Sequence, residues 1–209
     1  MRYVYIVGQH GSLCEYGQMF MRYGWGVTQD INQASLIQFT GGSDVSPELY
    51  GEQQHPKASV WRDRDKKEKT FFDYGNDNLI PMAGICRGGQ FLNVMNGGKM
   101  WQHVFNHAIG GTHEIIDLRS DKRIQVSSTH HQMMRPSPSA EVIAVADNIS
   151  KTKQHMNGNE IHSVVECIDH EVLFYPATES LCFQPHPEFN NVKECTDYYF
   201  HLIEHCLIP

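Results

Sequence analysis

The sequence predicts a three-layer α/β domain whose central sheet is mostly parallel, with antiparallel additions in its second half. In the first half, apolar runs of strand length alternate with segments of helical spacing, a pattern typical of parallel strands covered on both faces. In the second half, five short strand-like runs follow one another with turns between them, such as Asn-Gly-Asn at 157–159. No linker divides the 209 residues, so we expect one domain over residues 1–209.

The expected elements can be placed in chain order from apolar periodicity and turn residues. Strands of the parallel part are expected at residues 3–7, 36–40 and 82–85. Helices are expected at residues 13–23, 62–79, about 90–96 and about 192–206. Later strands are expected at residues 113–118, 124–127, 141–146, 161–168, 171–175 and 181–184. Gly75 and Asn76 weaken the second half of the second helix.

Composition excludes several classes of function. The formal net charge of −7 argues against general affinity for nucleic acid or anionic membranes. No apolar run approaches the roughly 20 residues that a membrane span needs. Residues 1–8 read as a first strand and lack a signal-peptide layout. The six cysteines contain no C-x-x-C pair, which predicts reduced, mostly buried thiols and a cytoplasmic location.

The most informative stretch is residues 84–90, Gly-Ile-Cys-Arg-Gly-Gly-Gln. An apolar run leads into Cys86, and glycines and a helix-compatible segment follow at once, which is the layout of a strand, a sharp turn and a helix. A thiol at that bend lies near the first N–H groups of the helix and the positive end of its dipole, which lower the thiol pKa. Cys86 is therefore a candidate nucleophile.

A cysteine nucleophile needs a base and a group that orients the base. In an extended segment, His186 and Glu188 point to the same side, and Pro187 between them restricts the backbone. Glu188 would fix the imidazole tautomer, while His186 would take the thiol proton and later protonate the leaving amine. Taken alone, the tripeptide more often means a surface histidine near a glutamate. Its position after an apolar strand, together with the cysteine turn, favours the catalytic interpretation.

An acyl-transfer site also needs hydrogen-bond donors for the developing oxyanion. The backbone amide of Arg87, directly after the nucleophile, is one natural donor. The second could come from the turn at Gly41 and Gly42, which follows the strand at 36–40 and lets the backbone approach a ligand closely. By itself, this turn could equally be an ordinary glycine-rich turn.

Taken together and in order, these motifs resemble the class I glutamine amidotransferases, and among them the branch of stand-alone γ-glutamyl hydrolases, the C26 peptidases. The resemblance covers residues from about 36 to 188. Residues 84–90 resemble the Gly-Ile-Cys-Arg-Gly-x-Gln of that branch, residues 128–132 its Asn-Ser-x-His-His-Gln region, and residues 184–188 its Gln-aromatic-His-Pro-Glu. Arg62 and Asp63 with the later Glu68 resemble its Arg-Asp…Glu entry to a helix. Glu166 falls where the family has an Ile-Glu-Ala strand.

The resemblance implies a flavodoxin-like class I amidotransferase fold and no cofactor. The site residues that it implies are a triad of Cys86, His186 and Glu188, an oxyanion hole from the backbones of Gly42 and Arg87, and substrate contacts from Gln90 and the backbone around His131 and Gln132. The sequence departs from the pattern at Pro185, where an aromatic residue is usual, at Ser128, where Asn is usual, and at Gly89, where a bulkier residue is common. Gly89 leaves two interpretations open, which are room for a larger leaving group and a looser helix start.

The expected reaction is attack on a γ-glutamyl amide, release of ammonia or an amine, and hydrolysis of a glutamyl thioester. Two substrate classes stay open within it. The protein could hydrolyse glutamine and pass ammonia to a separate synthetase subunit, or release an amine from a γ-glutamyl conjugate with no partner. A third interpretation, motivated by the departures from the motifs, is a non-catalytic relative that keeps the fold as a binding or regulatory module.

The 13 histidines are numerous enough to raise the question of metal binding. His103 and His107 are four apart, which is a ligand spacing if that stretch is helical. No His-Glu-x-x-His accompanies them, and Asn-Gly-Gly at 96–98 argues against a long helix there. The sequence therefore predicts no metal site.

Overall fold

The computed structural model describes residues 1–8, 13–147, 152, 154–163, 168–189 and 192–208. Most of its strands belong to one 11-stranded sheet. Five of them lie parallel and side by side, in the order β2 (Gly26–Thr28), β1 (Tyr3–Val7), β3 (Leu36–Phe39), β4 (Met82–Ile85) and β14 (Ser180–Phe183). Numbered by their position in the chain, these five strands have the order 2-1-3-4-5, which is the flavodoxin-like order. The predicted parallel sheet is confirmed.

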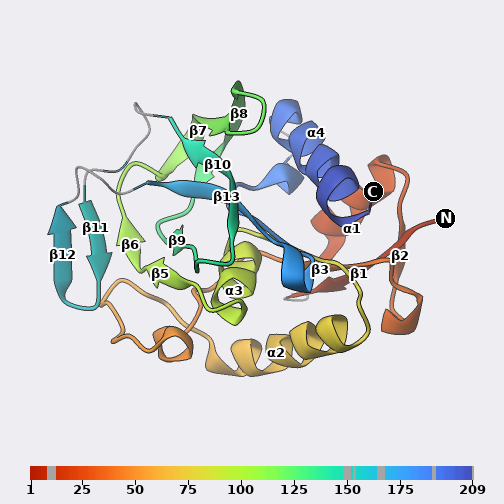
Figure 1. Ribbon diagram of the computed structural model, residues 1–209, viewed down its shortest axis with the longest axis horizontal. Helices are drawn as coiled ribbons and strands as arrows, with labels where there is room; N and C mark the ends of the chain where they lie inside the picture. Colours follow the sequence, from red (N-terminus) through yellow and green to blue (C-terminus); the bar gives the residue numbers. More distant parts are fainter. Residues whose placement is uncertain (9–12, 148–151, 153, 164–167, 190–191, 209) are drawn as a thin grey trace.

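The second half of the chain extends this sheet with antiparallel strands, as predicted. The path continues through β13 (His170–Tyr175), β10 (Glu141–Ala146), β7 (Ala108–Asp117) and β8 (Lys122–Thr129). Two short strands branch from this path: β9 (Met133–Arg135) pairs with β13, and β5 (Lys99–Trp101) pairs with β9. A separate small sheet consists of β12 (Glu160–Ser163), β11 (Gln154–Asn157) and β6 (His103–Val104), at the left of Figure 1.

Helices cover the sheet on both faces (Figure 1). One face carries α1 (Leu13–Arg22) and α4 (Lys193–Leu202), which continues as a π-helix over Ile203–Leu207, and the other carries α2 (Arg62–Asp77) and α3 (Arg87–Met95). Short 3-10 helices occur at Ile31–Gln33, Pro47–Tyr50, Pro176–Thr178 and Pro187–Phe189. None of the helices in the described part of the chain is both long and apolar enough to cross a bilayer.

The core consists of two apolar layers, because neighbouring residues of a strand face opposite sides. Leu36 and Leu181 pack with α1 and α4, whereas Ile37 and Cys182 pack with α2 and α3. Strands β3, β4 and β14 are therefore buried on both faces and contain almost only apolar residues. The predicted three-layer arrangement follows from this alternation.

Some element boundaries differ from the expected ones. Helix α2 runs through Gly75 without a break. The glycine lets the helix approach the sheet closely, because an added Cβ there would lie 2.9 Å from Met82 Sδ. Helix α3 begins at Arg87, directly after the cysteine. The strand expected at 161–168 is seen over Glu160–Ser163, and Glu166 lies outside the described residues.

The junction of β4 and α3 permits no side chain at Gly84. A Cβ added there would lie 2.3 Å from the carbonyl carbon of Gly88, which is backbone and cannot rotate away. We expect Gly84→Ala to lower the free energy of unfolding by about 1–3 kcal/mol, since overpacking forces the helix to shift. In Gly111→Ala, where an added Cβ meets nothing within 4 Å, we expect a change within about 0.5 kcal/mol. Urea unfolding of both variants tests this, and equal losses would contradict it.

Candidate active site

Three loops meet at one edge of the sheet because they follow three adjacent parallel strands. Phe39 in β3 pairs with Gly84 in β4, and β4 pairs in turn with β14. The segments that leave the carboxyl ends of these strands carry Gly41, Cys86 and His186. A Cβ added to Gly41 would lie 2.8 Å from His186 Cε1 and 3.7 Å from Cys86 Cβ. The structure therefore brings together the three loops that the sequence singled out, at the edge where open α/β sheets bind ligands.

Cys86 occupies a left-handed turn between β4 and α3. Its backbone angles are φ 50° and ψ −114°, a sparsely populated conformation for a residue with a side chain. Two backbone bonds hold it, from Cys86 N to Phe183 O at 2.7 Å and from Gln90 N to Cys86 O at 2.9 Å. Such a strained turn costs about 1–3 kcal/mol and is typical of a nucleophile held at the top of a sheet. The predicted strand, turn and helix are confirmed.

His186 lies between Cys86 and Glu188. Its Nδ1 is 2.6 Å from Glu188 Oε1, and its side chain is within hydrogen-bonding reach of Cys86. Burial disfavours the charged imidazole, but Cys86 and Glu188 outweigh it and raise the pKa of His186 to about 10. The imidazole is therefore charged at neutral pH. It also stacks on Phe189, with ring centroids 4.5 Å apart.

The segment that carries this histidine is anchored from both sides. The backbone N–H of His186 donates to Ser127 Oγ at 2.7 Å, which connects it to β8. The hydroxyl of Thr196 in α4 donates to Pro187 O at 2.7 Å. His186 and Glu188 are thus positioned by Ser127, which is 59 residues away in the sequence, and by the helix that follows them.

The glycine turn after β3 is held by two residues that the sequence did not single out. Arg64 donates to the carbonyls of Gly41 at 3.0 Å and Thr40 at 2.8 Å. The hydroxyl of Tyr16 accepts the N–H of Gly41 at 2.9 Å. In a trans peptide the N–H and C=O point in opposite directions. The bond from Arg64 to the Gly41 carbonyl therefore turns the N–H of Gly42 away from Arg64.

Arg64 belongs to a buried ionic network between α2 and α3. Its Nε lies 2.6 Å from Glu68 Oε1, and Arg87 forms ion pairs with both Asp65 and Glu68. All four side chains are buried, and Asp65 also accepts the N–H of Ser46 at 3.2 Å. The network therefore connects the glycine turn, the helix before β4 and the helix after the cysteine.

This network corrects one motif assignment. The sequence contains Arg-Asp twice in succession, and we matched Arg62 and Asp63 to the family's Arg-Asp…Glu pattern. The structure places Arg62 at the surface, paired with Glu48, and buries the following Arg64 and Asp65 instead. The buried Arg-Asp pair, which joins the network, is therefore two residues further along the chain than the pair matched to the motif.

The residues that follow Cys86 are held by the ionic network and by helix-to-sheet packing. Arg87 is 1% exposed and points to α2, so its side chain is a structural ion-pair partner. A Cβ added to Gly89 would lie 2.9 Å from both Gly84 O and Phe183 N. Gly89 thus permits close helix-to-sheet packing. Because a side chain at position 89 would point into the sheet, close packing explains Gly89 without a larger leaving group or a looser helix start.

The predicted substrate residues differ in accessibility. Gln90 is buried and donates to Gln184 Oε1 at 3.1 Å, and Gln132 is buried and donates to Gln102 O at 3.2 Å. His131 is partly exposed, with Nε2 3.2 Å from Asp44 Oδ1, and this hydrogen bond raises the pKa of His131. Of these three side chains, His131 is the one that solvent reaches.

Comparison with known proteins agrees with this architecture. The sequence model described as Peptidase C26 matches residues 27–152, which include Cys86. The chain therefore belongs to the Peptidase C26 family. It is 26% identical over 188 residues to Protein NtpR of Enterococcus hirae, covering 80% of this chain and 72% of that protein. It is 29% identical over 121 residues to the chloroplastic carbamoyl phosphate synthase small chain of Oryza sativa subsp. japonica, covering 58% of this chain and 24% of that protein.

Among solved structures, a glutamine amidotransferase from Thermotoga maritima superposes with a TM-score of 0.61. It covers 98% of this chain and 84% of its own, at 17% sequence identity. At that identity the likeness shows the fold alone. The fold is the flavodoxin-like fold of class I glutamine amidotransferases, as the sequence resemblance implied.

The buried network predicts a large stability difference between two acidic residues of α2. Glu68→Ala removes the carboxylate paired with Arg64 and one of the two paired with Arg87, so we expect a loss of about 3–5 kcal/mol in unfolding free energy. Asp73→Ala breaks only an exposed pair with Lys69 and is expected to cost less than about 1 kcal/mol. Denaturant unfolding measures both. Similar losses for the two variants would show that the network contributes no more than a surface pair.

Proposed function

We propose that this protein hydrolyses a γ-glutamyl amide through a glutamyl thioester on Cys86. The observation that carries the proposal is the arrangement of His186 between Cys86 and Glu188, beside a strained turn at the carboxyl edge of the sheet. Membership of the Peptidase C26 family supports an enzymatic role. All three positions of the triad are filled, which favours catalysis over a purely regulatory module.

The charged state of His186 suggests how the reaction starts. With the thiol proton on His186, the sulfur of Cys86 attacks the amide carbonyl carbon and forms a C–S bond. His186 then donates its proton to the nitrogen as the C–N bond breaks, so ammonia or an amine leaves. The neutral imidazole next takes a proton from water, whose oxygen attacks the thioester. Glutamate is released, and the proton held by His186 restores the imidazolium beside the thiolate.

The oxyanion formed in both steps needs two N–H donors. The amide of Arg87 lies at the first turn of α3, directly after the nucleophile, where the helix N-terminus favours negative charge. The amide of Gly42 is the second donor that we propose. Its support is the bond from Arg64 to the Gly41 carbonyl, which orients the shared peptide, and the φ of 130° at Gly42, which favours glycine.

Two leaving groups remain within this proposal. The C26 family and the motif at 84–90 favour a γ-glutamyl conjugate hydrolysed without a partner. The similarity to a carbamoyl phosphate synthase small chain favours a second candidate, a glutaminase subunit that delivers ammonia to a separate synthetase. Because the chain covers only 24% of that relative, we place the conjugate hydrolase first.

The reaction is tested by incubating the protein with glutamine and with a set of γ-glutamyl amines, and following glutamate release. We expect turnover of at least one substrate, with Cys86→Ala lowering kcat/KM by about 10⁴-fold or more, since the covalent step is lost. The matched control is Cys14→Ala, an exposed thiol in α1 that should leave activity unchanged. No turnover by the native protein, or equal activity of Cys86→Ala, would refute the proposal.

The orienting carboxylate is tested with Glu188→Gln. We expect kcat/KM to fall by about 10² to 10⁴-fold, because the amide can present the wrong hydrogen-bond partner to Nδ1. The same change removes one of the charges that raise the pKa of His186. In an NMR titration, the His186 imidazole of the native protein should stay charged well above pH 7 and lose its proton at a lower pH in the variant.

Glu141→Gln, an exposed position on β10, is the control for this pair of measurements. It should alter neither the activity nor the titration of His186. An unchanged His186 titration in Glu188→Gln would show that the carboxylate does not stabilise the imidazolium.

A further inference from the structure

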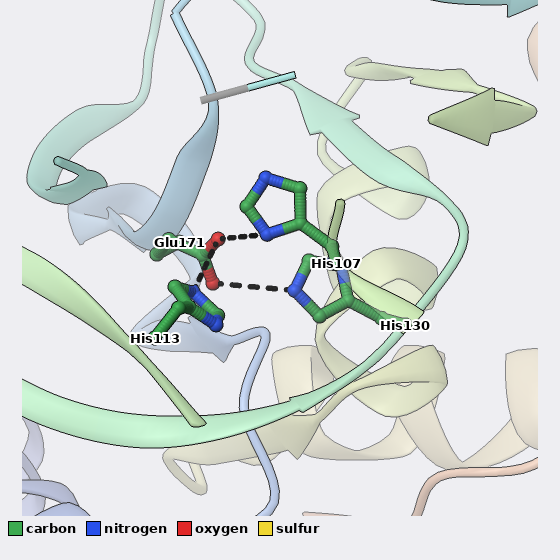
Figure 2. A group of neighbouring side chains, drawn as sticks. All are labelled: His107, His113, His130 and Glu171. Atoms are coloured by element: carbon green, nitrogen blue, oxygen red, sulfur yellow. Dashed lines mark hydrogen bonds and ion pairs between the residues drawn. The ribbon is translucent and has the colours of Figure 1, made fainter. Parts of the chain in front are cut away.

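A second group of ionisable side chains lies inside the antiparallel half of the sheet. His107 precedes β7, His113 is in β7, His130 follows β8, and Glu171 is in β13, and Figure 2 shows their side chains converging. All four residues are buried, and one ligand atom from each lies within 4.8 Å of the others. The proposed catalytic chemistry uses none of them, so their convergence needs another explanation.

The distances in this group match those of a tetrahedral metal site. Glu171 Oε1 lies 3.1 Å from His113 Nε2 and 3.4 Å from His107 Nδ1, and Oε2 lies 3.6 Å from His130 Nε2. A Zn²⁺ ion with bonds of about 2.0–2.1 Å in a tetrahedron requires ligand atoms about 3.3–3.4 Å apart. Because the four ligand atoms lie within 4.8 Å of one another, the more distant of them would move together by up to about 1.5 Å to surround such an ion.

The outer nitrogens of two of these histidines have the partners that metal-bound histidines usually have. His107 Nε2 lies 2.9 Å from Asp169 Oδ2, and His130 Nδ1 lies 3.0 Å from the carbonyl of Gln132. Asp169 is held in turn by His155 Nε2 at 2.9 Å. A hydrogen bond from the outer N–H to a carboxylate or carbonyl fixes the tautomer and leaves the inner nitrogen free to bind metal.

Without a cation, Glu171 Oε1 is within hydrogen-bonding distance of His113 Nε2, but Oε2 and His130 Nε2 are poorly matched. The carbonyl of Gln132 can only accept, so the single proton of a neutral His130 ring lies on Nδ1. Its Nε2 then presents a lone pair to the oxygen of Glu171, which also has only lone pairs to offer. Within the described part of the chain, both His130 Nε2 and Glu171 Oε2 are buried without a hydrogen-bond partner. A cation placed between them satisfies both atoms.

We propose that His107, His113, His130 and Glu171 form a closed structural Zn²⁺ site. Three imidazoles and one carboxylate suit Zn²⁺, and four protein ligands leave no open position for catalysis. The assignment departs from the sequence expectation of no metal, which weighed only His103 and His107. That pair does not lie on a helix, because His103 is in β6 and His107 precedes β7.

The site would brace the catalytic edge without taking part in the chemistry. His130 directly precedes His131 and Gln132, the residues expected near the substrate. The carbonyl of Glu171 accepts the N–H of Gln184 at 2.8 Å, two residues before His186. A bound ion would thus join three antiparallel strands just behind the loop that carries the base. The proposal does not depend on which amide the enzyme cleaves, or on whether it cleaves one.

The direct test is metal content and binding. The purified protein is stripped with a chelator, and Zn²⁺ is added back and counted by mass spectrometry. We expect about one tightly bound Zn²⁺ per chain. Substituted Co²⁺ should show the visible absorption of a tetrahedral ion without bands from thiolate ligands. The stripped protein should unfold at a lower temperature than the zinc-loaded protein.

Variants assign the ligands. His130→Gln and Glu171→Gln should each weaken Zn²⁺ binding by at least about tenfold, judged in the fraction that folds by circular dichroism. The matched control, His162→Gln, changes a partly exposed histidine on β12 paired with Glu160 and should bind Zn²⁺ like the native chain. If these buried variants fail to fold, the Co²⁺ spectrum of the native protein still decides the matter.

Three results would overturn the proposal. The first is a native protein that takes up no stoichiometric Zn²⁺ or Co²⁺. The second is a folded Glu171→Gln variant that binds as tightly as the native chain. The third is a Co²⁺ spectrum with thiolate bands, which would place the ion on cysteines. Because none of these readouts measures activity, failure of this proposal is distinguishable from failure of the proposed hydrolase function.

Discussion

The junction between β4 and α3 is the constraint on which the rest of the site depends. Gly84 and Gly88 allow the helix to start against the sheet with no room for a Cβ at either position. The chain can then turn only through a left-handed residue, and Cys86 occupies that position. One backbone geometry thus presents the thiol at the edge of the sheet and places the next amide at the helix N-terminus.

The buried ions behind this junction have a positioning role rather than a simple stabilising one. Two arginines and two carboxylates lie among apolar residues, where desolvation offsets much of their mutual attraction. The network fixes the orientation of the backbone groups that it holds. Arg64 holds the Gly41 carbonyl and Asp65 holds Ser46. Asp65 pairs directly with Arg87 at the start of the helix that follows Cys86, and Arg64 reaches Arg87 through Glu68. The orientation of the glycine turn is thereby tied to the helix that follows Cys86.

The candidate active site and the histidine group are connected through one pair of neighbouring strands, β13 and β14. Strand β14 leads into the segment of His186, and its neighbour β13 contributes Glu171 to the histidine group. Ser127 in β8 holds the backbone of His186, and His130 follows at the end of the same strand. The antiparallel additions therefore support the segment that carries His186 through backbone hydrogen bonds. The ion that we propose at their centre would limit how far His186 can move relative to Cys86.

The sequence by itself determined the residues that belong to local patterns. Cys86 lies between an apolar strand and a helix, and Glu188 lies two residues from His186. Each pattern can be recognised without knowledge of the rest of the chain. The parallel strands were predictable because strands buried on both faces are continuously apolar. Only the tertiary structure decided which of Arg62 and Arg64 is buried, because the two Arg-Asp dipeptides are identical in sequence. It also assembled His107, His130 and Glu171, because the pairing of antiparallel strands, which no local motif encodes, brings distant residues to one point.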